Sequence, residues 1–291
     1  MFGAAFLYAT TGILVREVAP MWGNNAQVAV RYALVLVFLV LYGLIKKKTF
    51  IVPQSKLPAA AALSILFALV VLFFTSAIEN TTVANSLFTY YAANMVISFI
   101  LGTLILREGL SVYKIIAIVL ALAGLSVYAN ALLAGNLGLL YGIAAGVCDG
   151  IANIFRKQLT GVDRNAVLSL QYLIGTVFTF MVTIFSGQEI IRHASIRGTA
   201  LTVLFAVVLI AGSNLLLYGF QHFDVNVGTV ITSTELVFAA IMAYALFNER
   251  PAPHELTGGL MILAASFVGS GILQKQKQRG QNDSAVLGQP D

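Results

Sequence analysis

Residues 57–78 read LPAAAALSILFALVVLFFTSAI, a run without a single charged side chain. The run has the length and polarity of a membrane-spanning helix, which needs about 20 apolar residues. Comparable runs recur along the 291-residue chain, of which 59% is hydrophobic and only 10% is charged. Soluble domains carry about 25% charged residues. The composition therefore excludes a water-soluble enzyme and a nucleic-acid-binding protein.

Short breaks rich in charged residues, Pro, Gly or Asn divide the chain into about ten predicted spans. Lipid accepts only helices or closed barrels, and these runs are about twice as long as a barrel strand. We therefore predict an all-α fold, a polytopic membrane protein with about ten transmembrane helices. The polar residues 274–291 are predicted to form a disordered cytoplasmic tail. The predicted spans are 2–16, 24–45, 57–78, 82–106, 111–131, 137–156, 166–186, 198–220, 226–247 and 253–273.

The Lys and Arg residues predict how the chain is inserted. Cytoplasmic loops of membrane proteins are enriched in these residues. Most of the 17 Lys and Arg residues fall on the side of the N-terminus, and Arg156 at the end of the sixth span is counted among them. We therefore predict a multi-pass protein of the cell membrane with both termini in the cytoplasm. The net charge of +5 is explained by loops that face an anionic leaflet, and no nucleic-acid partner is expected. Five of the Lys and Arg residues are not assigned to the cytoplasmic side: Arg31 lies inside a span, and Arg16, Arg192, Arg197 and Arg250 lie on the outer side.

A weak internal repeat relates the two halves of the chain. A shift of about 140 positions aligns Tyr32 with Tyr172, and a shift of about 141 matches the fourth and fifth spans of the two halves without a gap. The predicted repeats, residues 1–131 and 137–273, each hold five spans. Because five is an odd number, the second repeat must enter the membrane inverted relative to the first. Inverted repeats are common in secondary transporters, whose site lies at the interface between them.

Two segments resemble the signature half of the EamA domain. They are Ala77–Gly124 (AIENTTVANS…LREGLS…ALAG) and Tyr218–Ala265 (FQHFDVNVGT…STELVFAA…FNERP…GGLMILAA). Tandem EamA domains define a large branch of the drug/metabolite transporter superfamily, and the resemblance covers about residues 1–273. It implies an EamA-type permease, in which export is the commoner role and small metabolites or amino acids are the default cargo. No cofactor and no metal are implied.

The chain departs from the family pattern in its fourth and ninth spans. The family usually has Glu-Pro in the ninth span and a related proline in the fourth, where this chain has Glu235-Leu236 and Asn94-Met95. No span has a proline in its interior, so no proline kink is expected. The first span, which starts at Met1, is shorter than its second-half counterpart. Either the true start precedes Met1 or this helix is short.

Three ionisable residues inside spans are candidates for the substrate-binding site. They are Arg31 in the second span, Asp149 in the sixth and Glu235 in the ninth. Such a group costs about 2.5–3.5 kcal/mol on insertion scales and normally faces a cavity or a partner. The resemblance favours Glu235, which would bind an amino group of the substrate or carry a proton. The alternative for each is structural: a hydrogen bond to a neighbouring span, or snorkelling of Arg31 to the interface.

Polar residues on two symmetry-related spans predict the walls of a wetted pathway. Asn153 lies one helical turn after Asp149 and so on the same side. The alternative for these residues is ordinary bonding between spans, worth about 0.6 kcal/mol each. The remaining candidates are Asn85, Thr89, Tyr90 and Asn94 in the fourth span and Asn226 in the ninth.

A stripe of small residues, Gly142, Gly146 and Gly150, predicts that another helix approaches the sixth span closely. Packing within the chain is favoured over a seam between two copies, although a homodimer is left open. The stripe therefore predicts an intrachain helix contact.

The candidate functions fall into three classes. A secondary carrier would expose a site at the middle of the membrane alternately to either side. A passive channel is the first alternative. An intramembrane enzyme is disfavoured, because the sequence has no HExxH motif and only one cysteine. The chain also lacks the GxxxxGK[ST] loop, so it does not hydrolyse ATP. The sequence predicts a non-enzymatic carrier whose partners are a small-molecule substrate and the lipid bilayer.

Overall fold

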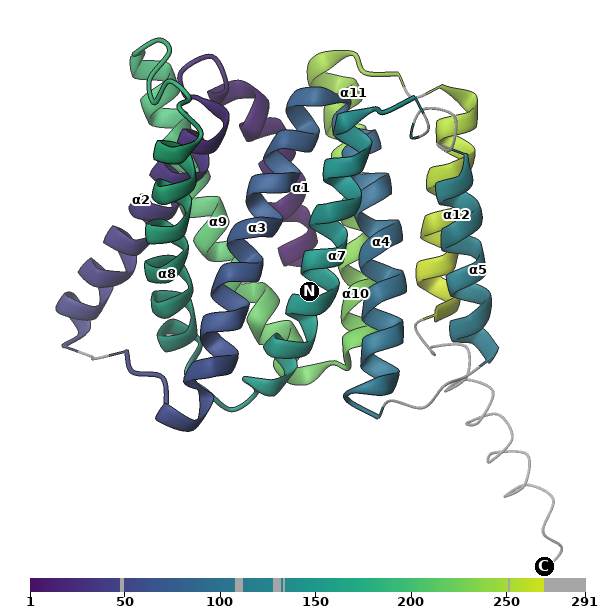
Figure 1. Cartoon of the computed structure of the whole chain (residues 1–291), viewed down its shortest axis with the longest axis horizontal. Helices are drawn as coiled ribbons and strands as arrows, with labels where there is room; N and C mark the ends of the chain where they lie inside the picture. The colour runs from purple at the N-terminus through teal and green to yellow at the C-terminus, as the bar shows by residue number, and fades with distance from the viewer. Residues whose placement is uncertain (48–49, 108–111, 128–131, 133, 251, 270–291) are drawn as a thin grey trace, which may run out of the picture.

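A computed structural model describes residues 1–47, 50–107, 112–127, 132, 134–250 and 252–269, apart from the side chains of Lys114, Asn226, His254 and Glu255. These residues form a bundle of long helices, and no strand occurs among them (Figure 1). The all-α prediction is confirmed for the described residues. The predicted tail, residues 274–291, lies outside them.

Each predicted span overlaps one helix, except the ninth, which the structure divides into α10 and α11. Seven segments of the described chain are long and apolar enough to cross a membrane. They are α2, η1–α3, α4, α7, α8, α9 and α10–α11, whereas α1, α5 and α12 have 17, 15 and 17 residues. The helices are α1 (Phe2–Val18), α2 (Asn24–Lys46), η1 (Gln54–Lys56), α3 (Leu57–Asn80), α4 (Val83–Leu104), α5 (Val112–Ser126), α7 (Leu137–Gln158), α8 (Arg164–Phe185), α9 (Ile196–His222), α10 (Val225–Ser233), α11 (Glu235–Phe247) and α12 (Pro253–Gly269).

The bundle turns apolar side chains outward and many polar side chains inward. Leu122, Leu204 and Leu260 are exposed, whereas Gln27 and Thr179 are fully buried. In water this arrangement would be unfavourable. In lipid it is required, because the hydrocarbon region cannot hydrogen-bond to polar groups. The distribution of side chains therefore agrees with a multi-pass integral membrane protein.

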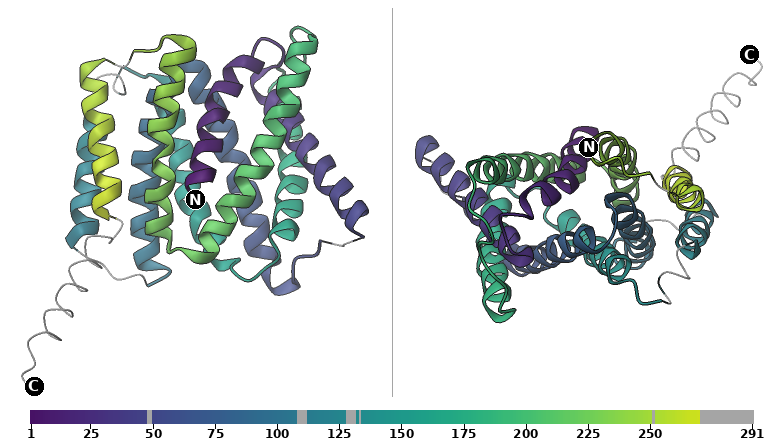
Figure 2. Two further views of the ribbon diagram at one scale, coloured as in Figure 1. Left: turned by 180° about the vertical axis from the view of Figure 1, so that it is seen from behind. Right: turned by 90° about the horizontal axis from the view of Figure 1, so that it is seen from above.

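The bundle is elongated when it is viewed along its helices (Figure 2). The helices α2 and α8 pack together at one end, and α5 packs against α12 at the other. Between these pairs, α7 packs against α3 and α4, and α1 packs against α9 and α11. The central helices surround the cavity described below.

The ninth span is interrupted at Thr234 although it contains no proline. Thr234 separates α10 from α11, and the Val237 amide bonds back to its carbonyl with the three-residue spacing of a tighter turn. Three consecutive side chains, Thr232, Ser233 and Thr234, return hydrogen bonds to carbonyls in the preceding turn. Such bonds bend helices. No proline kink was expected in this span, and none is present; the break instead coincides with hydroxyl side chains that bond back to the helix.

The stripe of glycines on α7 packs against α4 within the chain, as predicted. A Cβ atom placed on Gly146 would lie 2.2 Å from the carbonyl oxygen of Tyr90, and one on Gly142 would lie 2.1 Å from Oγ1 of Thr89. Both separations are far below van der Waals contact. The two helices can therefore approach this closely only because these positions lack side chains.

We predict that Gly146→Ala destabilises the protein although alanine favours helix. The added methyl group must push against the α4 backbone, and overpacking of this kind costs about 1–3 kcal/mol. Thermal unfolding in detergent micelles measures the effect. Leu140→Ala is the matched control, because Leu140 lies on the same helix and is 45% exposed. An unfolding temperature of Gly146→Ala at or above that of the unaltered protein would contradict the prediction.

Candidate functional site

A cavity with an empty volume of about 730 Å³, its open mouth included, lies among the central helices. Its walls come from α1 to α4 and from α7, α9, α10 and α11, so both halves of the chain contribute. Aromatic and aliphatic side chains dominate the walls, with polar groups at a few points. The lining residues are Tyr8, Thr11, Val15, Arg31, Phe67, Val70, Val71, Phe74, Thr75, Tyr90, Tyr91, Asp149, Asn153, Arg156, Phe205, Leu209, Leu216, Phe220, Thr232 and Glu235.

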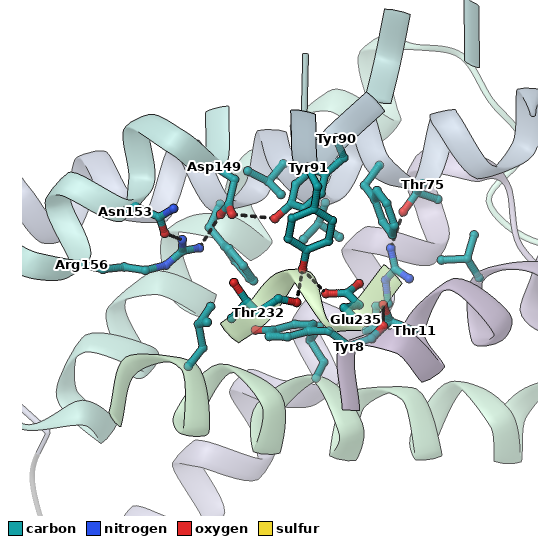
Figure 3. A pocket seen from close by; sticks show the side chains of 18 of the residues that line it. Tyr8, Thr11, Thr75, Tyr90, Tyr91, Asp149, Asn153, Arg156, Thr232 and Glu235 are labelled. Carbon is teal, nitrogen blue, oxygen red and sulfur yellow. Dashed lines mark hydrogen bonds and ion pairs between the residues drawn. The ribbon is translucent and has the colours of Figure 1, made fainter. Parts of the chain in front are cut away.

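An ion pair between Asp149 and Arg156 forms one side of the cavity (Figure 3). Both residues belong to α7, and Oδ1 of Asp149 lies 2.7 Å from Nη2 of Arg156. The other carboxylate oxygen accepts hydrogen bonds from the Tyr90 hydroxyl at 2.6 Å and from the Asn94 amide at 2.7 Å. Asp149 is thus compensated in charge and bonded at both oxygens.

Side-chain amides extend this network behind the ion pair. The Asn153 amide donates to Oδ1 of Asn94 at 3.2 Å and to the Ser98 hydroxyl at 3.1 Å, and its own oxygen accepts from Arg156. Ser98 in turn donates to Oδ1 of Asn94 at 2.8 Å. All these side chains are buried. The network ties α4 to α7 and holds the Asp149–Arg156 pair in place.

Glu235 occupies the first position of α11, at the break in the ninth span. The Tyr91 hydroxyl lies 2.7 Å from Oε2 of Glu235 and 2.8 Å from the carbonyl oxygen of Thr232. Figure 3 shows Tyr91 and Glu235 between the Asp149 side of the cavity and Thr75. Among the ion pairs of the described residues, none includes Glu235. The carboxylate is therefore held in the cavity wall without a cationic partner.

Arg31 projects from α2 and is 1% exposed. Its Nη2 donates to the Thr75 hydroxyl at 2.7 Å, and its guanidinium lies over the ring of Phe205, 4.2 Å from the ring centre. Within the described part of the chain, Nε and Nη1 have no hydrogen-bond partner. Snorkelling to the interface does not describe this residue, because its whole side chain is buried.

A second ion pair lies beyond the cavity at one end of the bundle. Arg16 at the end of α1 pairs with Glu249 after α11. Arg16 also donates to the Thr81 carbonyl at 2.9 Å, and the other oxygen of Glu249 accepts the Val83 amide at 3.2 Å. The pair thus connects α1, the turn between α3 and α4, and the end of α11.

The structure brings most of the predicted site residues together. Arg31, Tyr90, Asp149, Asn153 and Glu235 all line the cavity. Asn94, Thr89 and Asn85 do not line it. Asn94 lies behind the lining and bonds Asp149, whereas Thr89 bonds carbonyls of its own helix and faces Gly142. Asn85 is buried outside the lining, and the side chain of Asn226 lies outside the described residues.

The prediction that Arg156 belongs to the cytoplasmic surface was wrong. Arg156 is 4% exposed, because α7 continues to Gln158 and Asp149 lies two turns earlier on the same face. The sequence did contain a signal for this pairing, because Asp149 and Arg156 are seven residues apart and so lie on the same face of a helix. The hydroxyl groups of Tyr8 and Thr75 were also missed as lining residues. Their positions in the sequence do not reveal which helix face looks inward.

The site has the features of a binding site for a small polar solute. It combines an apolar wall with a few fixed charges and hydroxyl groups. In the described part of the chain, no three His, Cys, Asp or Glu side chains come together as a possible metal site. The arrangement is therefore suited to hold and release a solute through hydrogen bonds and charge.

Comparisons with known proteins agree on the fold and the family. No curated protein matches the chain. A solved crystal structure shares the fold with a TM-score of 0.69, covering 92% of this chain and 95% of its own, at 16% sequence identity. The profile of the EamA-like transporter family matches residues 1–129 and again 136–270. The chain therefore belongs to the EamA-like transporter family.

Proposed function

We propose that this protein is a secondary carrier that exports small metabolites or amino acids by alternating access. The observation that carries the proposal is the buried cavity, whose walls come from both halves of the chain and which holds charged groups among apolar ones. Membership of a transporter family supports it. A small solute would bind in the cavity, and a rearrangement of the halves would expose it to one side at a time.

We further propose that residues 1–131 and 137–273 form inverted five-helix repeats. The packing supports this arrangement: α7 contacts α3 and α4 of the first half, and α1 contacts α9 and α11 of the second. Helices in equivalent positions pair with each other, α2 with α8 and α5 with α12. Tyr32 and Tyr172, which the internal repeat aligns, meet edge to face with ring centres 5.0 Å apart. Such self-pairing is expected near a two-fold axis that relates two repeats.

The proposed insertion keeps both termini in the cytoplasm of a cell membrane. Lys56 donates to the carbonyl of Gln158, and Lys157 donates to that of Phe223, so these ends of the helices lie together. Arg192, which was assigned to the outer side, does not contact these helix ends. It contacts the carbonyl of Ala19 at the end of α1. The grouping of Lys residues at one end supports its assignment to the cytoplasmic side.

The two acids of the cavity are proposed to have different roles. Asp149 is neutralised by Arg156 and bonded by Tyr90 and Asn94, so it serves mainly to hold α7 and α4 together. Among the described residues, Glu235 has a single side-chain donor, Tyr91, and no cation within an ion pair. Glu235 is therefore the acid that contacts the substrate.

We predict that the protein in vesicles shows saturable counterflow of a labelled solute, and that Glu235→Gln abolishes it. Solutes are first selected by a thermal-shift screen of metabolites on the purified protein. Glutamine retains an oxygen that can accept the Tyr91 hydroxyl, so the fold should persist while the charge is lost. Thermal unfolding without solute checks that point.

The matched control is Glu17→Gln, which removes a carboxylate outside the cavity, where Glu17 pairs with the exposed Arg197. It should retain counterflow. Flux that rises linearly with concentration and shows no counterflow would contradict a carrier and indicate a channel. A solute that is chemically altered on passage would indicate an enzyme.

We predict that Asp149→Asn costs stability, because it leaves Arg156 buried without a counter-charge. Breaking a buried pair by removing one partner costs about 3–5 kcal/mol. The double variant Asp149→Asn/Arg156→Gln removes both charges and should recover most of the loss. Thermal unfolding of both variants in one detergent gives the comparison. A double variant no more stable than the single one would show that the ion pair does not serve this structural role.

A further inference from the structure

Three side chains on one face of α2 carry buried polar atoms that lack a partner. Asn24, Gln27 and Arg31 are spaced three and four residues apart and therefore share a face of the helix. All three are buried. Within the described part of the chain, Oδ1 of Asn24, Oε1 of Gln27, and Nε and Nη1 of Arg31 have no hydrogen-bond partner. Unpaired polar atoms thus follow this face of α2 along about two helical turns.

The same face of α2 meets a polar face of α3. Only one bond joins each α2 side chain to α3, and the longest of the three exceeds the usual range of about 2.7–3.2 Å. We call the two faces together the α2–α3 seam. Its members are Asn24 with Ser76 (2.9 Å from Nδ2 to Oγ), Gln27 with Glu79 (3.5 Å from Nε2 to Oε1) and Arg31 with Thr75 (2.7 Å from Nη2 to Oγ1).

The contact between α4 and α7 shows how a dry polar interface of this bundle is completed. In the described residues, no side-chain atom of Asn94, Asp149 or Asn153 is buried without a partner. Lipid offers no hydrogen bonds, so an unpaired buried group is unfavourable in this protein. The α2–α3 seam therefore differs from the α4–α7 contact, because its own side chains do not satisfy it.

The seam leads from the cavity to one end of the bundle. Arg31 and Thr75 line the cavity, and Figure 3 places Thr75 on the side away from Asp149. At the other end of the seam, Asn24 is the first residue of α2, and Glu79, next to the last residue of α3, is exposed. The seven residues from Arg31 back to Asn24 span about 10 Å of helix. This end is the outer one in the proposed insertion.

Water satisfies every unpaired atom of the seam. The amide oxygens of Asn24 and Gln27 only accept hydrogen bonds, whereas the guanidinium of Arg31 only donates them. A cation would suit the oxygens but be repelled by Arg31, and an anion would suit Arg31 but not the oxygens. Water both donates and accepts. The chemistry of the seam therefore indicates contact with water.

The two helices that border the seam are held by different neighbours at the outer end. Before α2, the amide of Gly23 donates to the carbonyl of Ile190, in the loop between α8 and α9, at 3.2 Å. After α3, the carbonyl of Thr81 accepts from Arg16 of α1 at 2.9 Å. The outer ends of α2 and α3 can therefore part without breaking either of these bonds.

We propose that the α2–α3 seam is the outward path of the carrier, which parts so that water and the solute pass between the cavity and the outer surface. The inference rests on the proposed carrier function and names the helices between which its site opens. With its three bonds formed, the seam is closed. When it parts, water replaces these bonds and also pairs the atoms that lacked a partner, so the opening forms more hydrogen bonds than it breaks.

The reactivity of introduced cysteines tests whether the seam opens to the outside. Cys148, the only cysteine of the chain, is first replaced by serine. Gln27→Cys and Ser76→Cys are then treated, in intact cells that express the full chain, with trimethylammonium-ethyl methanethiosulfonate. This charged reagent does not cross the membrane, and it reacts with thiolates. A thiolate forms where water reaches the thiol, so both cysteines should react.

Two control positions separate the seam from lipid and from the core. Ser76 and Met181 each lie four residues before the end of their helix on the outer side, but Met181 is 52% exposed on the apolar surface of α8. Val28 adjoins Gln27 and is fully buried. The seam cysteines should react at least about tenfold faster than Met181→Cys and Val28→Cys, because neither control thiol is reached by water.

A crosslink tests whether transport requires the seam to part. Asn24→Cys/Ser76→Cys, in the Cys148→Ser background, is bridged by a short bifunctional methanethiosulfonate, which forms disulfides that a reductant removes. The bridged protein should lose counterflow of the solute selected in the screen above and regain it after reduction. The protein with Cys148→Ser alone, treated in the same way, should keep its counterflow.

The outcomes separate this inference from the carrier function. Seam cysteines that react no faster than the controls would overturn the outward path, and counterflow retained in the same variants would leave the carrier intact. Reaction from the cytoplasmic side alone, in inside-out vesicles, would also overturn the path as an outward one. Undiminished counterflow of the bridged protein would show that the solute takes another route. Fast reaction at the seam without counterflow of any solute would instead overturn the carrier and retain the opening of the seam.

Discussion

A lipid bilayer offers no hydrogen bonds to the side chains that it surrounds, and the rest of this structure depends on that constraint. Each polar group on a span must find its partner inside the bundle. Asp149 has Arg156, Tyr90 and Asn94, and the side-chain amides behind them complete a closed network. Where the network stops, at Arg31 and Glu235, charged groups face the cavity instead. The same constraint that stabilises the fold therefore leaves two ionisable side chains on the wall of the cavity in which we propose that a solute binds.

The helical fold could be predicted from the sequence because it follows from local composition. A run such as residues 57–78 contains no group that needs water, and only a helix satisfies its backbone in lipid. The candidate site could be predicted only in part. Asp149 and Glu235 stand out because an ionisable residue inside an apolar run is conspicuous. Arg156 does not stand out, because burial at the end of a span depends on the acid two turns earlier and on the helices around it.

The hydroxyl groups were the least predictable part. Nothing in the sequence distinguishes Thr75 and Tyr91 from other residues of apolar spans. Only the packing of the helices shows that both side chains face the cavity. The break at Thr234 has the same origin. Neighbouring Thr and Ser side chains bond back to their own helix, and Tyr91 from α4 occupies the Thr232 carbonyl. The run Thr232–Ser233–Thr234 is visible in the sequence. The contact of Tyr91 with the Thr232 carbonyl depends on how α4 packs against α10 and cannot be predicted from the ninth span alone.

The ion pair of Arg16 and Glu249 has a consequence for movement at its end of the bundle. One carboxylate accepts from both Arg16 and the first amide of α4, while the same arginine holds the Thr81 carbonyl. Separation of α1 from α11 would break the Arg16–Glu249 pair, whereas the Arg16–Thr81 and Glu249–Val83 bonds would still hold each of these helix ends to the start of α4. Because the ends of α1 and α11 are each anchored to the start of α4 as well as to each other, movement of either helix away from this end must also break its bond to the residues around α4.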